Sequence, residues 1–445
     1  MVLKYEVMKK EFRRYDVTDL VTSIYCRLEA GGWPGVPLHA LTRDEVQDFT
    51  QAELYLDIRV VADPSGIFLC GDTAQTIARG LGFRFTDVVT LFYHDNLRRT
   101  KAGLPPVALP KIETLEVNYR THSGVLDAAS VCITTLKQRF PFSIDALPAE
   151  RAHFRGLPPL LLPELSERDV TILLSGSDRS ASTVEFGAHQ AVLVRDQVSA
   201  KNLPAGLRGA ALVLTVPQAK GAQGGTARSM LPCSDACTHA GLEFDDVVIA
   251  NFFSDSPCKE EWRILLSYLD KLDLRPSEAP GDAGAALDRA AAAEGFLRPL
   301  AFDPERHVTM AEELKHLYTA ITRAKCNVVF TDRDAAARAP FYHLLRRMGL
   351  ARSVRSSILD DDGQHHGLMR GRSGPAEWAL RAANLCDGAE SGWSWRPPPT
   401  GARAMRRTRL PAPPPPARCA RRRCRTRLRL RARSGDGMRR LLMLG

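Results

Sequence analysis

The sequence predicts an α/β fold that is built on parallel sheets. Between Asp44 and Gly71, an amphipathic stretch of helical length is followed by the apolar run GIFLC, and a strand, a helix and a strand at this separation form a βαβ unit. Short apolar runs alternate with helical stretches again in the second half of the chain. A chain of 445 residues can bury a sizeable core, so we expect two domains of this kind.

The N-terminal part contains two predicted helices and a strand. The segment DVTDLVTSIYCRL is expected to form a helix with Asp16 or Thr18 as its N-cap. Leu54, Ile58 and Val61 recur at helical spacing, which predicts a second helix before the strand GIFLC. The run LHALTR, at the first strand position of the βαβ unit, is too polar for a well-buried strand.

The second half of the chain alternates strands and helices. It begins after a Pro-rich stretch at 101–115, which is a plausible domain boundary. Helices are predicted at 124–140 and 310–324, and residues 278–294, which are rich in small residues, form either a surface helix or a loop. Buried strands are predicted at VTILLS (170–175), QAVLVRD (190–196), AALVLTV (210–216), DDVVIANFF (245–253) and NVVFTD (327–332).

Composition argues against a membrane or secreted protein. No apolar run approaches the roughly 20 residues that cross a bilayer, and the charged N-terminus lacks the apolar core of a signal peptide. The ten cysteines are scattered along the chain, which is typical of reduced thiols inside a cell. We therefore expect an intracellular protein, in the nucleus or the cytoplasm, with no membrane partner.

The net charge of +10 belongs to the C-terminal tail. Residues 400–445 contain fifteen Arg and one Asp, so residues 1–399 carry a net charge of −4. From residue 351 onward the periodicity fades, and the Arg- and Pro-rich sequence is typical of a disordered segment. The high isoelectric point therefore predicts nothing about a basic groove on the folded part.

Two polar clusters follow the two strands of the βαβ unit. Asp44 and Glu45 come after the first strand, and Gly71, Asp72 and Gln75 come after the second. Ligands of a parallel sheet bind outside the carboxyl ends of its strands, and Mg²⁺ prefers carboxylate oxygens. One acid can then hold the metal while the other orients a water molecule. The alternative is that both acids only open a solvated helix, where they suit the helix dipole.

Six short segments occur in a characteristic order along the chain. They are DEVQD (44–48), GDTAQTI (71–77), VNYRTHSG (117–124), LTVPQAKG (214–221), GLEFDDV (241–247) and LYTAITRAK (317–325). In this order they resemble the later motifs of superfamily 1 helicases of the UvrD/Rep type, and most of all the helicase-like region of large eukaryotic TPR and ankyrin repeat-containing proteins. The resemblance covers residues 1–335.

The resemblance implies parallel-sheet RecA-like (P-loop NTPase) domains. Residues 1–105 would be the C-terminal part of a first domain, and residues 106–350 would be the second domain. Residues 351–445 would follow as a low-complexity, disordered tail.

The resemblance also implies ATP and Mg²⁺ as ligands. Asp44 would hold Mg²⁺, and Glu45 would be the base that orients the attacking water. Gln75 would contact the γ-phosphate, Arg120 would reach it from the second domain, and Arg323 would be the arginine finger. Taken alone, Arg120 could instead form an ordinary ion pair, and Arg323 could be a surface cation at a helix end.

Four further residues would contact the nucleotide. By the same resemblance, Tyr119 would stack on the adenine and Glu243 would bind the ribose hydroxyl. Gln47 and Asp48, which complete the segment DEVQD, would lie on the nucleotide side as well.

A single strand of DNA or RNA is the implied partner. Phe83, Arg84 and Phe85 would form an aromatic platform with an interleaved cation, which suits the stacking of bases. Packing of the two phenylalanines in the core is an equally good interpretation. Thr215 resembles a threonine of the family that contacts the strand backbone, but Pro217 replaces the histidine usual nearby in bacterial relatives.

Two features depart from the family. The sequence contains no G-x-x-x-x-G-K-[ST] loop, whose backbone N–H groups and lysine would cradle the phosphates. We therefore expect a truncated first domain and poor ATP hydrolysis. In addition, an extra stretch at 222–241 separates AKG from GLEF, and we hypothesise that it is a retained intron.

The sequence thus predicts a fragment of a UvrD-like ATP-dependent helicase or translocase, in which ATP hydrolysis drives movement on a single strand. The alternative is a non-catalytic scaffold or regulatory module that keeps the same fold.

Overall fold

The computed structural model describes residues 2–76, 82–162, 189–203, 211–213, 243–269 and 283–353. All of them belong to one unit of the chain, Met1–Ser391. Four features predicted from the sequence lie outside the described residues: the strand at 170–175, Thr215, the extra stretch at 222–241 and nearly all of the tail.

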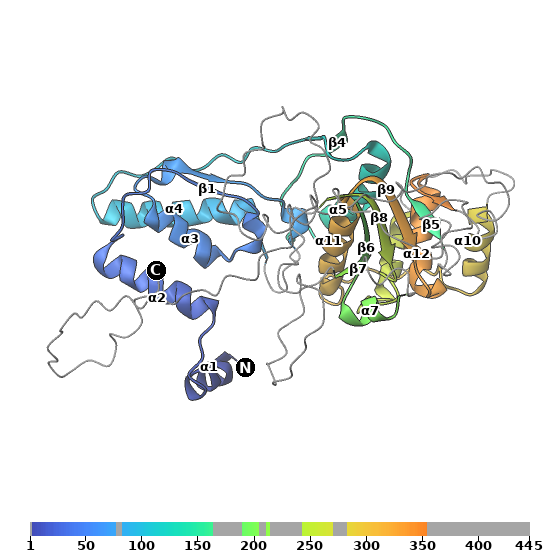
Figure 1. The fold of residues 1–445 in the computed structure, drawn as a ribbon, viewed down its shortest axis with the longest axis horizontal. Coiled ribbons are helices and arrows are strands. Elements are labelled where there is room, and N and C mark those ends of the chain that lie inside the picture. The colour runs from blue at the N-terminus through green and yellow to red at the C-terminus, as the bar shows by residue number, and fades with distance from the viewer. Residues whose placement is uncertain are drawn as a thin grey trace, which may run out of the picture. The chain divides into compact units, whose positions relative to one another are not determined.

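Two helices open the chain (Figure 1). Helix α1 spans Val2–Glu11 and helix α2 spans Val17–Gly31. Asp16 caps α2, because its carboxylate accepts a hydrogen bond from Asp19 N while the Asp19 carboxylate accepts one from Asp16 N. The predicted helix and its Asp16 cap are therefore confirmed.

The predicted βαβ unit is present. Strand β1 (Leu41–Arg43) pairs in parallel with β2 (Ile67–Leu69), and the 3₁₀ turn η1 (Val46–Asp48), helix α3 (Gln51–Val60) and the 3₁₀ turn η2 (Pro64–Gly66) lie between them. Both strands are only three residues long, and Phe68 in the middle of β2 is 63% exposed. Only one face of this small sheet is therefore covered.

Helix α4 (Phe85–Lys101) follows the 3₁₀ turn η3 (Thr73–Gln75) and was not predicted. Its residues Val88 and Phe92 pack with Leu54 and Ile58 of α3 and with Phe83 in a local core. Packing of two amphipathic helices against each other thus stabilises the N-terminal part, where the sheet contributes little.

The second part of the chain contains a six-stranded, wholly parallel sheet. The strand order is β10 (Arg352–Ser353), β5 (Leu160–Leu162), β9 (Ala324–Thr331), β8 (Phe244–Ala250), β6 (Gln190–Val194) and β7 (Ala211–Val213). The strands predicted near 190, 210, 245 and 327 are confirmed, whereas β5 and β10 were not predicted. The mixed α/β class with parallel sheets is therefore correct.

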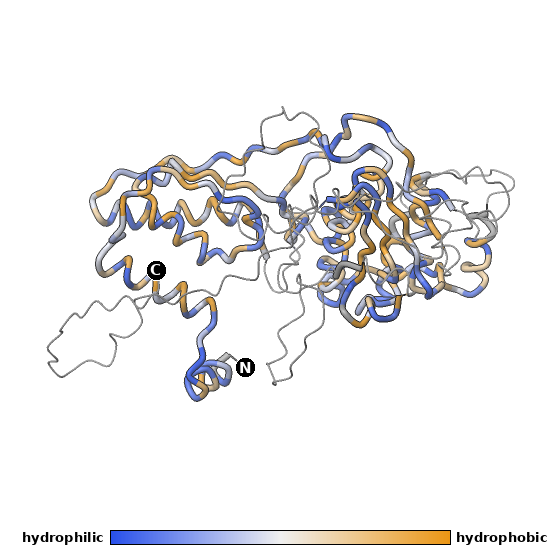
Figure 2. The backbone as a smooth tube through the Cα atoms, in the orientation of Figure 1, coloured by the Kyte–Doolittle hydropathy of each residue, from blue (hydrophilic) through white to orange (hydrophobic). Residues whose placement is uncertain are grey.

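The large sheet is buried on both of its faces. Side chains alternate along a strand, so Leu161, Val247 and Phe330 lie on one face while Val248 and Val329 lie on the other, and all five are at most 2% exposed. The central stretches of these strands are accordingly hydrophobic in Figure 2.

Three long helices pack into this core, with shorter segments around them. Helix α5 (Ser123–Arg139) and helix α11 (Val308–Thr322) confirm the predicted helices, and α12 (Ala335–Arg347) adds Phe341 and Tyr342 beside Phe330. Residues 283–293 form helix α10, so this part of the small-residue segment is a helix and not a loop. The remaining short elements are the parallel pair β3 (Val117–Asn118) and β4 (Arg151–Ala152), α7 (Gln197–Lys201), the 3₁₀ turn η4 (Glu261–Leu265) and α9 (Leu266–Leu269).

No helix within the described ranges is both long and apolar enough to span a membrane.

Candidate functional site

Asp44 and Glu45 lie directly after β1, where the chain turns sharply. Glu45 has φ +51° and ψ +43°, in the left-handed region that a residue with a side chain rarely adopts. The Asp44 carboxylate supports this turn, because its Oδ1 accepts hydrogen bonds from Glu45 N at 2.8 Å and from Cys70 Sγ at 3.1 Å. Strained backbone of this kind is concentrated at functional sites, which favours the functional interpretation of the two acids.

Gln47 is buried beside these acids and contacts the protein at both ends of its amide. Its Nε2 donates to Glu45 Oε2 at 2.5 Å, and its Oε1 accepts from Asp72 N at 3.1 Å, while only 1% of the residue is exposed. This geometry holds Glu45 in place and leaves little for a nucleotide to contact. Asp48 is partly buried, and burial followed by the charge of Glu45 raises the pKa of its carboxyl.

Gln75 connects the second polar cluster to the C-terminal end of α11. Asp72 caps the turn η3, since its Oδ1 accepts from Ala74 N at 2.8 Å and its Oδ2 accepts from Gln75 Nε2 at 2.9 Å. Arg323 Nη2 in turn donates to Gln75 Oε1 across 248 positions of sequence. The structure therefore brings two of the predicted catalytic residues into direct contact.

Arg323 is buried, with an exposed fraction of 2%, so the interpretation as a surface cation is wrong. Its Nε also donates to Thr319 O at 3.2 Å. Burial lowers the pKa of this guanidinium, as does the nearby charge of Arg120, whereas the charges of Glu45 and Glu243 act in the opposite direction. The charges of Arg120, Glu45, Asp72 and Glu243, which come from distant parts of the sequence, thus all act on Arg323.

Arg120 and Glu243 form an ion pair with each other. Arg120 Nε lies 2.5 Å from Glu243 Oε1, and Lys325 Nζ lies 2.8 Å from Glu243 Oε2. Burial raises the pKa of Glu243, but the hydrogen bond from Lys325 and the charge of Arg120 outweigh it and lower that pKa overall. Arg120 therefore forms an ion pair in this structure, as its alternative interpretation expected. Lys325 is a further cation of the site, and the sequence analysis did not predict it.

Tyr119 is 72% exposed beside this ion pair. Its ring lies next to that of His153, with centroids 5.3 Å apart and planes inclined by 35°. An exposed aromatic ring beside charged residues is compatible with base stacking.

The proposed strand platform is partly wrong. Phe83 is 2% exposed and packs in the local core, with its ring centroid 5.2 Å from that of Phe85 in a T-shaped arrangement. Of the two interpretations, core packing is therefore the correct one for Phe83. Arg84 is partly exposed and pairs with Asp87 at 2.8 Å.

The residues at Asp44 fit Mg²⁺ only in part. Within the described ranges no group of three or more His, Cys, Asp and Glu side chains could hold a metal ion. Mg²⁺ commonly takes one or two carboxylates and completes its shell with water and phosphate oxygens, and Asp44 can supply one such carboxylate. The three cations Arg120, Arg323 and Lys325 suit a triphosphate in charge, although Glu243 pairs with two of them.

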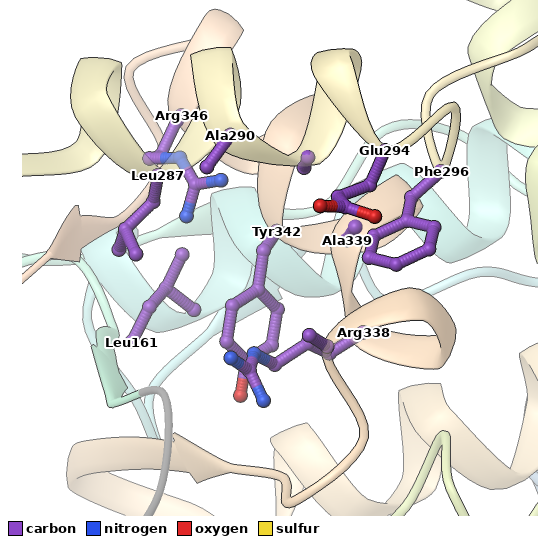
Figure 3. A pocket seen from close by; sticks show the side chains of 11 residues that line it. Leu161, Leu287, Ala290, Glu294, Phe296, Arg338, Ala339, Tyr342 and Arg346 are labelled. Atoms are coloured by element: carbon purple, nitrogen blue, oxygen red, sulfur yellow. The ribbon is translucent and has the colours of Figure 1, made fainter.

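A separate cavity of about 190 Å³ lies between α10, α12 and β5 (Figure 3). Apolar side chains line most of it, including Leu161, Phe296 and Tyr342, with Glu294 and Arg338 among the few charged groups. It contains none of the residues predicted for the site.

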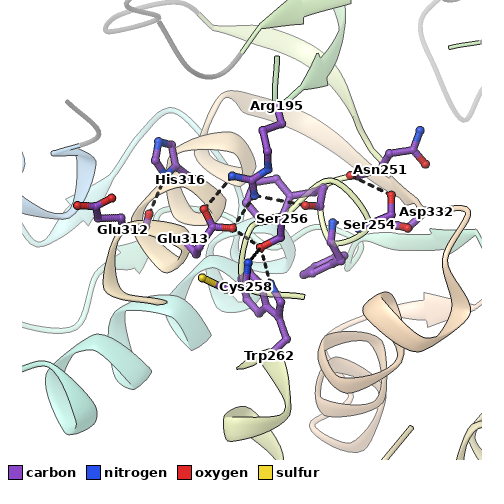
Figure 4. Close-up of polar contacts among 12 residues, drawn as sticks. Arg195, Asn251, Ser254, Ser256, Cys258, Trp262, Glu312, Glu313, His316 and Asp332 are labelled. Atoms are coloured by element: carbon purple, nitrogen blue, oxygen red, sulfur yellow. Dashed lines mark hydrogen bonds and ion pairs between the residues drawn. The ribbon is translucent and has the colours of Figure 1, made fainter. Parts of the chain in front are cut away.

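A separate group of buried polar side chains surrounds Glu313 of α11 (Figure 4). The guanidinium of Arg195 forms a two-pronged ion pair with Glu313, at 2.8 Å and 2.6 Å. Ser256 donates to Glu313 Oε2 at 2.5 Å and accepts from Trp262 Nε1 at 3.3 Å. All four residues are buried, and their mutual contacts indicate a structural role.

The sequence is similar to that of a much longer known protein. No family model matches the sequence. The chain is 37% identical over 379 residues, which is 84% of its length, to the human protein named TPR and ankyrin repeat-containing protein 1. The matched region is 12% of that protein. The chain is therefore homologous to a small part of TPR and ankyrin repeat-containing protein 1.

Proposed function

We propose that this chain is part of a UvrD-like ATP-dependent helicase or translocase. The observation that carries the proposal is the arrangement around Arg323, where Gln75 from the βαβ part and the charges of Glu45, Arg120 and Glu243 meet. Phosphoryl transfer needs positioned carboxylates on one side and guanidinium groups on the other, and these residues provide both.

Each residue has a defined task in this proposal. Asp44 would hold Mg²⁺, which would neutralise charge on the phosphate oxygens, and Glu45 would orient and deprotonate the attacking water. Arg323 would compensate the charge that spreads over the γ-phosphate oxygens. Arg120 would assist it after exchanging its pairing with Glu243 for a phosphate oxygen. Tyr119 would offer its exposed ring to the adenine.

A second candidate is a non-catalytic module that keeps the same architecture. The observation that favours it is the lack of a G-x-x-x-x-G-K-[ST] loop anywhere in the sequence. Without the backbone N–H groups and lysine of that loop, binding of the phosphates would rest on Arg120, Arg323, Lys325 and the Mg²⁺ that Asp44 would hold.

The two candidates differ in nucleotide turnover. We would measure phosphate release from ATP with Mg²⁺, with and without single-stranded DNA or RNA, together with binding of a fluorescent ATP analogue. For an enzyme, Glu45→Gln should lower turnover about 100-fold or more with little change in binding, since general base catalysis contributes about that much. Arg323→Met should do the same.

Matched surface substitutions provide the controls. Glu305→Gln and Arg306→Met change exposed residues near the start of α11 and should leave turnover unchanged. Turnover that survives Glu45→Gln would refute the assignment of the base. Nucleotide binding without any turnover would favour the non-catalytic module.

A further inference from the structure

Glu45 and Arg323 are joined by a continuous line of hydrogen bonds. Glu45 Oε2 accepts from Gln47 Nε2 at 2.5 Å, and Gln47 Oε1 accepts from Asp72 N at 3.1 Å. The Asp72 carboxylate accepts from Gln75 Nε2 at 2.9 Å, and Gln75 Oε1 accepts from Arg323 Nη2. Five residues from three separate segments of the chain therefore form one connected line.

The direction of each hydrogen bond in this line is fixed by its partners. A backbone N–H can only donate, so the oxygen of the Gln47 amide must face Asp72 and its nitrogen must face Glu45. In the same way, the Arg323 guanidinium can only donate, so the oxygen of the Gln75 amide faces it and the nitrogen faces Asp72. Neither amide can be turned round without breaking both of its contacts.

The Gln47 amide packs directly against Gly71. A Cβ added at Gly71 would lie 2.3 Å from Gln47 Oε1 and 2.9 Å from a Val46 methyl group, so the space beside the amide exists only because residue 71 is glycine. Gln47 is also 1% exposed, and a buried amide that lost one partner would leave a polar group unsatisfied.

We infer that Gln47 is a positioning residue that sets the carboxylate of Glu45 and couples it, through Asp72 and Gln75, to Arg323. Gln47 does not touch a reacting atom in this scheme. If Arg323 leaves the Gln75 amide for an anion, Gln75 loses one of its two contacts, and the change reaches the hydrogen bond on Glu45 through Asp72. The functional meaning of this coupling rests on the proposed function, but the coupling itself is a property of the folded chain.

Hydrogen exchange tests the coupling without a nucleotide. In the full chain, Gln47→Met removes both contacts of the amide while keeping its length. We expect the amide of Asp72 to exchange about tenfold faster, since a single hydrogen bond is worth about that factor. Gln51→Met, an equally conservative change at an exposed position of α3, should leave the exchange of Asp72 unaltered.

A charge variant separates a positioning role from simple packing. Gln47→Glu places two carboxylates in contact, so they should share a proton and one of them should have a raised pKa. The unfolding equilibrium constant of this variant, relative to the parent chain, should therefore fall about tenfold or more between pH 8 and pH 5. Protonated Glu has the shape of Gln, so this variant also serves if Gln47→Met does not fold.

A double substitution tests whether the line reaches Arg323. Gln47→Met and Arg323→Met should not act independently on unfolding, with a coupling factor of about threefold or more, because members of one hydrogen-bond network are non-additive. Gln51→Met and Arg323→Met should combine additively. Unchanged exchange at Asp72, a flat pH profile for Gln47→Glu, or additivity of Gln47→Met with Arg323→Met would each overturn the inference. Absence of ATP turnover in the parent chain would refute only the proposed function.

Discussion

Asp145 caps a helix that begins sixty residues earlier in the sequence, at Phe85. The Asp145 Oδ2 atom accepts a hydrogen bond from Phe85 N at 2.7 Å, and its Oδ1 accepts from Thr86 N at 3.3 Å and from Thr86 Oγ1 at 3.1 Å. Arg84, at the N-cap position of α4, makes no capping hydrogen bond with its own side chain. The first turn of α4 is therefore satisfied by a residue of the second part of the chain.

Asp145→Ala should destabilise the chain by about 1–2 kcal/mol, because the free N–H groups at a helix start are left without their acceptor. Asp145→Asn, which keeps an oxygen acceptor, should recover about half of that loss. Urea unfolding followed by circular dichroism measures both values. An Asn variant as unstable as the Ala variant would indicate that the charge matters and the cap does not.

The buried pair of Arg195 and Glu313 leads to a second prediction. Both residues are at most 6% exposed, and Ser256 and Trp262 complete the network around the Glu313 carboxylate. Glu313→Gln should cost about 3–5 kcal/mol, because it removes the negative charge that Glu313 places against the buried Arg195 guanidinium.

Arg195→Met combined with Glu313→Leu removes both charges and should recover much of this loss. Thermal unfolding of Glu313→Gln, of Arg195→Met and of the double variant tests this expectation. If the double variant were as unstable as Glu313→Gln, the packing around the pair, and not its charge balance, would determine the cost.

Local patterns in the sequence were sufficient to predict the long elements. The helices α2, α3, α5 and α11 have apolar residues at helical spacing, and the strands β6, β8 and β9 are apolar runs. Strand β5 is the short run Leu160–Leu162 between prolines, which is too brief to predict a strand by itself, and its pairing with β9 defines it. Helix α4 was missed in part because its cap comes from Asp145, which local sequence cannot reveal.

The candidate site shows the same division between local and distant information. The order of the motifs predicted that Asp44, Glu45 and Arg323 belong to one site. It did not predict that Arg323 would bind Gln75 or that Arg120 would pair with Glu243, because both contacts join segments that are far apart in sequence. For Phe83, two interpretations fitted the sequence equally well, and only burial decided between them.

Lys315 should make stability depend on pH in the alkaline range. It is 5% exposed and donates to Ser143 O at 2.6 Å, and burial lowers the pKa of its ammonium group to about 8 in spite of the nearby charges of Asp72, Glu312 and Asp145. The unfolded chain keeps the ordinary value of 10.5, so between these two pKa values the unfolded state binds more protons than the folded state. The contribution of Lys315 to stability therefore rises as the pH increases from about 8 to 10.5. It is lost again as the pH falls back through about 8.

This contribution amounts to at most about 3 kcal/mol over the whole range. Between pH 7 and pH 9.5, the free energy of unfolding of the parent chain should rise relative to that of Lys315→Met. Lys259→Met, at an exposed lysine, should follow the parent chain at every pH. Parallel pH profiles for the parent chain and Lys315→Met would contradict the prediction.

Cys70 should report on the state of Asp44. Its thiol donates to Asp44 Oδ1 at 3.1 Å, and this hydrogen bond, followed by burial, raises the pKa of the thiol to about 11. Only the thiolate reacts with iodoacetamide, so Cys70 should be nearly inert at pH 8.

Asp44→Asn removes the negative charge and should speed alkylation of Cys70 by about tenfold or more, since a shift of one unit in pKa changes the thiolate fraction tenfold. Mass spectrometry of the Cys70 peptide measures this rate, with the exposed Cys26 as an internal standard that should not change. An unaltered rate at Cys70 would mean that Asp44 does not control its thiol, and the close contact at the end of β1 would then have no electrostatic consequence.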